Sequence, residues 1–130
     1  MDNGKPIRET LAVDIPSAAH HFRYFAACIL SAEGSATVLD GQYLSIILHE
    51  PIGVVGQIVP WNFPFLMGAW KLAPVIAAGD CTIFKPSSET SLSILELARI
   101  IKEHCSQRSF QCYHRSWFKK WSIFIRSSSN

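Results

Sequence analysis

The chain has 130 residues, of which 48% are hydrophobic and 17% are charged. This composition excludes a disordered chain, a collagen-like repeat and a disulfide-rich miniprotein. No apolar run is long enough to cross a membrane and charged residues begin at Asp2, so the sequence predicts neither a membrane span nor a signal peptide. The four cysteines are irregularly spaced and contain no C-x-x-C pair, which predicts reduced thiols in a cytoplasmic protein and no metal site.

The net charge of +2 conceals a change of character near residue 104. Residues 1–103 hold 7 Lys/Arg and 10 Asp/Glu, whereas residues 104–130 hold 5 Lys/Arg, 6 aromatic residues and no acid. We therefore divide the chain into a domain fragment, residues 1–103, and a basic aromatic tail, residues 104–130, which we do not expect to belong to the fold.

Hydrophobic periodicity predicts the elements of the domain fragment in chain order. An amphipathic helix is expected from Pro16 to about Glu33, with Asp14 as its cap. A turn at Asp40-Gly41 precedes a short strand, Tyr43 to His49. A second strand, Ile52 to Val59, is apolar on both faces, which is typical of an interior parallel strand covered by helices on each side.

Two further helices and one strand complete the domain fragment, which contains no internal repeat. Pro64 and Gly79 bracket a nearly all-apolar helix, a strand follows from Cys81 to Phe84, and a last helix begins at about Ser91. Strand, helix, strand, helix is a βαβα unit, so the sequence predicts an α/β fold with a partial Rossmann-like parallel sheet. Two βα units alone leave apolar surface uncovered, and we expect the second strand and the Pro64 helix to expose much of theirs.

Ligands of such sheets bind at the carboxyl ends of the strands. Two loops follow strands here, Pro60 to Phe63 and Lys85 to Ser88. Neither contains the G-x-G-x-x-G fingerprint of dinucleotide-binding loops. Taken alone, Asn62 fits a helix N-cap before Pro64, and Lys85 fits a solvated charge. Residue pattern by itself therefore indicates an α/β fragment with a candidate pocket.

Six stretches of the domain fragment carry more information than the fold class: DNGKP (2–6), HFRYFA (21–26), EPIGVVGQIVPWNFP (50–64), WKLAP (70–74), AAG (77–79) and FKPS (84–87). In this order they closely resemble the NAD(P)-dependent aldehyde dehydrogenase family. The resemblance covers residues 1 to about 103 and implies part of that family's cofactor-binding domain, preceded by a helix and an oligomerisation-type strand, Tyr43 to His49.

The resemblance implies a role for each strand-end loop. Ile58, Val59, Pro60 and Trp61 would line the nicotinamide side of the cofactor cleft. Asn62 would be a catalytic residue, donating its side-chain amide to the aldehyde oxygen. A preorganised donor of this kind lowers a barrier by about 3 to 4 kcal/mol.

The second loop would hold the adenosine side of the cofactor. Lys85 would bind the ribose hydroxyls, with Pro86, Ser87 and Ser88 in the same cofactor-binding loop. Many relatives that prefer NAD carry a glutamate at the position of Ser88. A serine neither repels a 2′-phosphate nor holds the ribose diol firmly, so the cofactor stays open between NAD and NADP.

Members of the family oxidise an aldehyde to a carboxylic acid through a cysteine thiohemiacetal, and a glutamate activates the hydrolytic water. The resemblance places that cysteine and that glutamate beyond the matched region. None of Cys28, Cys81, Cys105 and Cys112 stands in the nucleophile's sequence context. The sequence therefore predicts an aldehyde dehydrogenase-like chain that is inactive by itself, a fragment or pseudogene product, with its aldehyde substrate undetermined.

Two other classes of function stay open. The tail could pair phosphates and stack bases, binding single-stranded nucleic acid or an anionic surface, although we expect neither a nucleic-acid nor a membrane partner. Alternatively, the chain is a non-catalytic partner that associates with an intact aldehyde dehydrogenase through Tyr43 to His49 and the first helix. An exposed edge strand of this kind could also simply aggregate.

The tail also fits a frameshift. Relatives continue after residue 103 with a peptide such as FNVITGRGSKSGQ, and one choice of codons for it, read from the third base, spells Gln111 to Ser122 of this chain. Our hypothesis is that residues from about 105 onward are translated from a shifted frame of an aldehyde dehydrogenase gene. Sequencing the locus tests it: family segments are expected downstream in another frame, and their absence would refute the hypothesis.

Overall fold

The computed structural model describes residues 2–104 and 110–112, so the roles considered for the rest of the tail lie outside the described residues. Among the described residues, no helix is both long and apolar enough to span a bilayer. The elements in chain order are α1 (Ile7–Glu9), η1 (Thr10–Asp14), α2 (Ile15–Leu30), β1 (Ser35–Leu39), β2 (Tyr43–Ile47), β3 (Val54–Ile58), α3 (Pro64–Ala77), β4 (Cys81–Lys85), α4 (Leu92–His104) and β5 (Phe110–Cys112).

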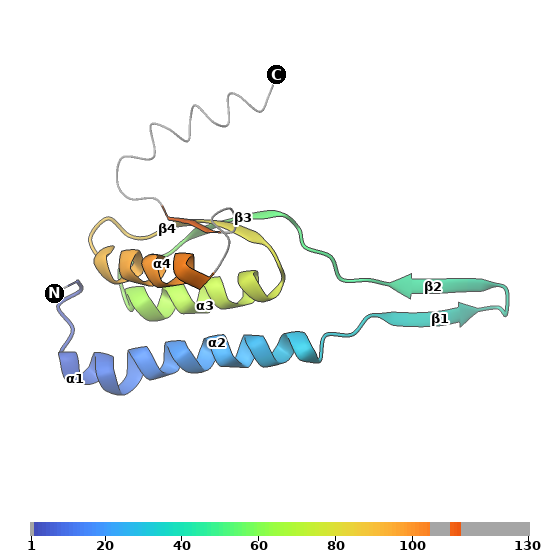
Figure 1. Cartoon of the computed structure of the whole chain (residues 1–130), viewed down its shortest axis with the longest axis horizontal. Coiled ribbons are helices and arrows are strands. Elements are labelled where there is room, and N and C mark those ends of the chain that lie inside the picture. The colour runs from blue at the N-terminus through green and yellow to red at the C-terminus, as the bar shows by residue number, and fades with distance from the viewer. Residues whose placement is uncertain (1, 105–109, 113–130) are drawn as a thin grey trace, which may run out of the picture.

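The predicted βαβα unit is confirmed. Strands β3 and β4 pair in parallel, with α3 as the crossover between them, and α4 follows β4. Backbone pairing adds β5 in parallel on the other side of β4, giving the order β3-β4-β5. The fold is thus α/β with a small parallel sheet, and helices α3 and α4 lie on one face of it (Figure 1).

Strand β3 is not the doubly covered interior strand that its composition predicts. It lies at an edge of the described sheet, and the described helices cover only one of its faces. Gln57 and the following Val59 are buried toward the helices, whereas Val54 is 65% exposed and Ile58 is 79% exposed. Side chains alternate between the faces of a strand, so one face of β3 is packed and the other is open.

Helix α3 is covered more completely than we expected. It lies between α2 and the layer formed by α4 and the sheet (Figure 1). Leu72 packs in a core with residues of β4 and α4, whereas Leu66 and Ala69 form a second cluster with Ala18 of α2. The expectation that the apolar surface of this helix stays exposed is therefore wrong for most of its length, because α2 supplies the missing cover.

Helix α2 has its first turn where the sequence predicts it, with Pro16 near its start, and it ends at Leu30, earlier than the predicted Glu33. The chain is already helical before it, through α1 and η1. Asp14 does not cap α2: its backbone is helical, and its carboxylate instead accepts a hydrogen bond from Lys5 Nζ at 2.7 Å. The sequence missed this earlier start because a proline after an aspartate is typical of a helix N-terminus.

Strands β1 and β2 form an antiparallel hairpin that extends away from the helices and the parallel sheet (Figure 1). The predicted strand is β2, and the predicted turn is present, with positive φ at Asp40 and Gly41. The partner strand β1 was not predicted. All residues of both strands are exposed, so the hairpin packs on nothing among the described residues.

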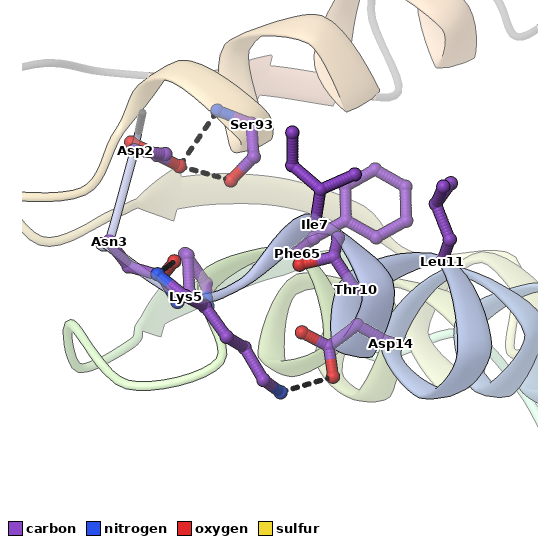
Figure 2. Close-up of a pocket in the computed structure, with 10 residues that line it drawn as sticks. Asp2, Asn3, Lys5, Ile7, Thr10, Leu11, Asp14, Phe65 and Ser93 are labelled. Atoms are coloured by element: carbon purple, nitrogen blue, oxygen red, sulfur yellow. Dashed lines mark hydrogen bonds and ion pairs between the residues drawn. The ribbon is translucent and has the colours of Figure 1, made fainter.

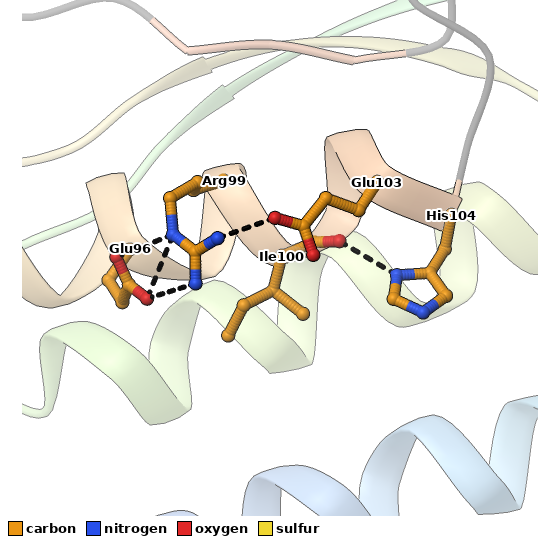
Figure 3. A network of polar contacts seen from close by, with 5 residues as sticks. All are labelled: Glu96, Arg99, Ile100, Glu103 and His104. Carbon is orange, nitrogen blue, oxygen red and sulfur yellow. Dashed lines mark hydrogen bonds and ion pairs between the residues drawn. The ribbon is translucent and has the colours of Figure 1, made fainter.

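The solvent face of α4 carries a polar network (Figure 3). Arg99 pairs with Glu96 at 2.8 Å and with Glu103 at 2.5 Å, and the ring of His104 contacts the carbonyl of Ile100. The hydrogen bond from Arg99 lowers the pKa of Glu96 below its ordinary value. Exposed pairs of this kind contribute little to stability, so α4 is held mainly by its opposite, apolar face.

Replacement of Leu72 by alanine tests the enclosure of α3. Leu72 is 0% exposed, so Leu72→Ala is expected to lower the free energy of unfolding by about 2–5 kcal/mol. Leu92 is 64% exposed, and Leu92→Ala is expected to change the free energy of unfolding by less than about 0.5 kcal/mol. Urea denaturation followed by circular dichroism measures both, and equal losses in the two variants would contradict the described core.

Candidate functional site

The parallel pairing of β3 with β4 brings the two strand-end loops together. Ile58 lies opposite Lys85 in the register, and the next residue, Val59, donates its N–H to the Lys85 carbonyl at 3.2 Å. Helices α3 and α4 both begin at this edge, because each follows one of the strands. The positive ends of two helix dipoles therefore lie at the edge where the sequence placed the ligand.

The first loop presents Asn62 to solvent. The Asn62 side chain is exposed, and it does not cap α3, since the N-cap position is Phe63 and receives no side-chain hydrogen bond. On the N-terminal side of Asn62, the Trp61 carbonyl accepts a hydrogen bond from the Thr90 hydroxyl at 3.2 Å. The Asn62 carboxamide is thus free of the role in helix capping that its position before Pro64 suggested.

The second loop, Lys85 to Ser88, has one exposed serine, and its other residues are partly or fully buried. Lys85 is half-buried at the end of β4, and Pro86 behind it is fully buried. The Ser87 hydroxyl accepts the N–H of Glu89 at 3.3 Å, which closes a local turn, whereas Ser88 is exposed. The Ser88 hydroxyl is therefore the more accessible of the two.

The predicted site residues separate into accessible and packed ones. Val59 is 3% exposed and Pro86 is fully buried, so their side chains shape the loops from behind. The side chains that reach the surface or its margin at this edge are those of Ile58, Pro60, Trp61, Asn62, Lys85, Ser87 and Ser88.

A pocket of about 330 Å³ lies against the first turns of α3 and α4 (Figure 2). Its wall includes Lys5 and Asp14, which form the ion pair described above, and Phe65. Asp2 also lines it and caps α4: its carboxylate accepts the N–H groups of Leu92 at 3.0 Å and Ser93 at 2.9 Å, and the Ser93 hydroxyl.

Sequence reasoning missed these supporting side chains. Asp2 and Lys5 belong to the DNGKP stretch that matched the family, but the stretch carried no assigned role. Helix caps are normally local, and Asp2 lies 91 residues from Ser93. The family match was the signal that could have drawn attention to them.

A parallel βαβ unit with two helix N-termini and polar side chains at its carboxyl edge defines the class of α/β proteins that bind ligands at that edge. The model of the aldehyde dehydrogenase family matches residues 1–107. An aldehyde dehydrogenase of Rhodospirillum rubrum is 58% identical over 103 residues, and one of Vibrio cholerae is 64% identical over 100 residues. The chain belongs to the aldehyde dehydrogenase family.

Solved structures agree with this assignment. PnpE of Pseudomonas sp. WBC-3, solved in complex with nicotinamide adenine dinucleotide, is 36% identical with a TM-score of 0.85, and the match covers 90% of this chain and 24% of that one. The NAD+ complex of an aldehyde dehydrogenase from Bacillus cereus is 36% identical with a TM-score of 0.84, and the match covers 89% of this chain and 24% of that one. The match to the Rhodospirillum protein covers 79% of this chain and 20% of the relative, and that to the Vibrio protein covers 77% and 20%. The chain thus spans about a fifth of the length of these curated relatives.

Proposed function

We propose that residues 1–103 form the cofactor-facing part of an NAD(P)-dependent aldehyde dehydrogenase. The observation that carries this proposal is the edge shared by β3 and β4, where Ile58 and Lys85 lie in register and Asn62 is exposed beside them. The NAD complexes of the two solved relatives support an NAD-type cofactor.

The side chains at this edge fit that cofactor. The Lys85 ammonium group offers three donors at the end of β4, which suits the two hydroxyls of a ribose. Ser88 is exposed and neutral, so the loop admits either NAD or NADP. The bound nicotinamide would supply the hydride acceptor of the reaction.

Asn62 is the proposed donor to the aldehyde oxygen. When a thiolate adds to an aldehyde, negative charge develops on that oxygen, and an amide N–H fixed beforehand stabilises it. A neutral donor does so without protonating the thiolate. The exposed carboxamide of Asn62, free of a capping role, is compatible with this function.

We propose that these 130 residues bind cofactor without turnover. Cys28 lies on α2, Cys81 begins β4 at the end opposite Lys85, and Cys112 ends β5 in register with Phe84; none of the three stands in the sequence context of the family's nucleophile. We also propose a cytoplasmic location, which the sequence predicts from its irregularly spaced cysteines. The covalent step would require a cysteine and a glutamate from the family's later segments.

We also propose that the residues from about 105 onward derive from a shifted reading frame. The family match ends at residue 107, close to the change in charge at residue 104. The short parallel pairing of β5 with β4 is compatible with this origin, because strand pairing uses backbone groups that every sequence carries.

Calorimetric titration of the full chain with NAD and NADP, alongside an aldehyde oxidation assay, tests the cofactor role. Saturable binding without turnover is expected. Lys85→Met is expected to weaken binding by about tenfold or more, the effect of losing two hydrogen bonds, whereas Lys102→Met on the exposed face of α4 should not. Absence of binding, turnover by this chain, or equal affinity of the two variants would contradict the proposal.

A second candidate function, assembly with an intact aldehyde dehydrogenase chain, is favoured by the hairpin. The register places Ala36, Val38, Leu44 and Ile46 on one face, all apolar, whereas the other face mixes polar and apolar residues: Ser35, Thr37, Leu39, Tyr43, Ser45 and Ile47. Val38 and Leu44 are each 63% exposed. A two-stranded ribbon is marginally stable in water, and such an apolar face normally packs against another chain.

Charge placed on either face of the hairpin distinguishes assembly from simple exposure. The chain, carrying an affinity tag, is co-expressed with an intact aldehyde dehydrogenase of the family, and the amount retained is measured. Ile46→Lys is expected to reduce retention at least about tenfold because it buries a charge, whereas Thr37→Lys should retain most of it. Equal retention by both variants would exclude the apolar face as the contact.

A further inference from the structure

We propose that Lys5 is a positioning residue for Asn62. Through its contacts with Asp14 and Phe63, Lys5 fixes the backbone turn that presents the Asn62 carboxamide at the carboxyl edge of the sheet. The importance of this turn for catalysis rests on the proposed function, in which Asn62 donates to the aldehyde oxygen. The turn itself is observed independently of that function.

The turn is strained at Phe63. This residue has φ 50° and ψ 49°, in the left-handed region that glycine adopts readily and bulky side chains rarely do. It also precedes Pro64, and a residue before proline is normally restricted to extended conformations. Such a conformation persists only where its surroundings hold it.

Lys5 supplies a specific contact to the strained residue. Its Nζ lies 4.1 Å from the centroid of the Phe63 ring, within the range of a cation–π interaction. Phe63 is 43% exposed, so burial alone does not fix its side chain. Removing the ammonium group removes this attraction while leaving the aliphatic stem of the side chain available for packing.

Asp14 fixes the direction of the ammonium group. Nζ of Lys5 lies 2.7 Å from Oδ1 of Asp14, and the two side chains are only 17% and 5% exposed. Figure 2 shows the Lys5 side chain extending toward Asp14. Solvent screens a pair at this depth much less than a surface pair, so Lys5 has a defined position rather than a choice of rotamers.

Both neighbours of Asn62 are therefore anchored to distant parts of the chain. The Trp61 carbonyl accepts the Thr90 hydroxyl, and Phe63 lies against Lys5. The Phe63 carbonyl also accepts the first hydrogen bond of α3, from Met67 at 2.8 Å. Asn62 is exposed, so the backbone on either side of it sets the direction of its carboxamide.

Hydrogen exchange of the full chain, followed by mass spectrometry, measures the effect. In Lys5→Met, exchange in the peptide covering residues 61–67 is expected to rise by about fivefold to tenfold, because the loop and the Met67 hydrogen bond open more often. Lys5→Arg should restore slow exchange, since a guanidinium group both pairs with a carboxylate and stacks on a ring. Lys102→Met is the matched control and should not differ from the parent chain.

Each outcome decides the proposal. Unprotected residues 61–67 in the parent chain, or equal exchange in Lys5→Met and the parent, would overturn it. A rise spread evenly over β4 and α4 would overturn it in favour of a general structural role. A parallel NAD titration of the parent chain separates the two proposals: absence of NAD binding by the parent would refute only the cofactor role, because the exchange difference between Lys5→Met and the parent does not depend on bound cofactor.

Discussion

The structure depends on one pairing, that of β3 with β4. Two parallel strands cannot be joined by a tight turn, so the chain needs a crossover, which α3 provides. Because both strands run in the same direction, both of their following loops leave from the same edge. The register of Ile58 with Lys85 then decides which side chains meet there. Without this pairing, the two strand-end loops would have no common surface.

Most of this unit could be predicted from the sequence, because periodicity and helix punctuation are local signals. Pro64 and Gly79 do bracket α3, and the strand predicted from Cys81 ends within one residue of β4. The errors concern the burial of β3 and α3, and they share one cause: which element packs on a given face is not determined by the local sequence. The composition of β3 predicted helices on both faces, but only one face receives them, and α3 is covered by α2, which no periodicity could assign as its neighbour.

The positions of the strand-end residues in the fold could be predicted from the sequence, whereas the residues that contact them from elsewhere in the chain could not. The strand-end rule places Asn62 and Lys85 at one edge from the order of strands and helices alone. Lys5 and Thr90 contact the same loop although they are distant from it in sequence. Their local sequence pattern is the same as that of ordinary surface lysines and threonines, so it does not reveal these contacts. The short strand β1 was missed for a related reason, since it is fully exposed and has no core-facing side to reveal it.

The contact of Asp2 with the first turn of α4 has a consequence for the order of folding during synthesis. The Asp2 carboxylate accepts hydrogen bonds from the N–H groups of Leu92 and Ser93, which are synthesised about 90 residues later. This contact therefore forms only after almost the whole α/β unit has left the ribosome. The hairpin and α2 are each built from neighbouring residues and can begin to form earlier. The contact between Asp2 and α4 is thus formed late in folding and joins the N-terminal segment to the last helix. Until it forms, the first turn of α4 lacks its cap.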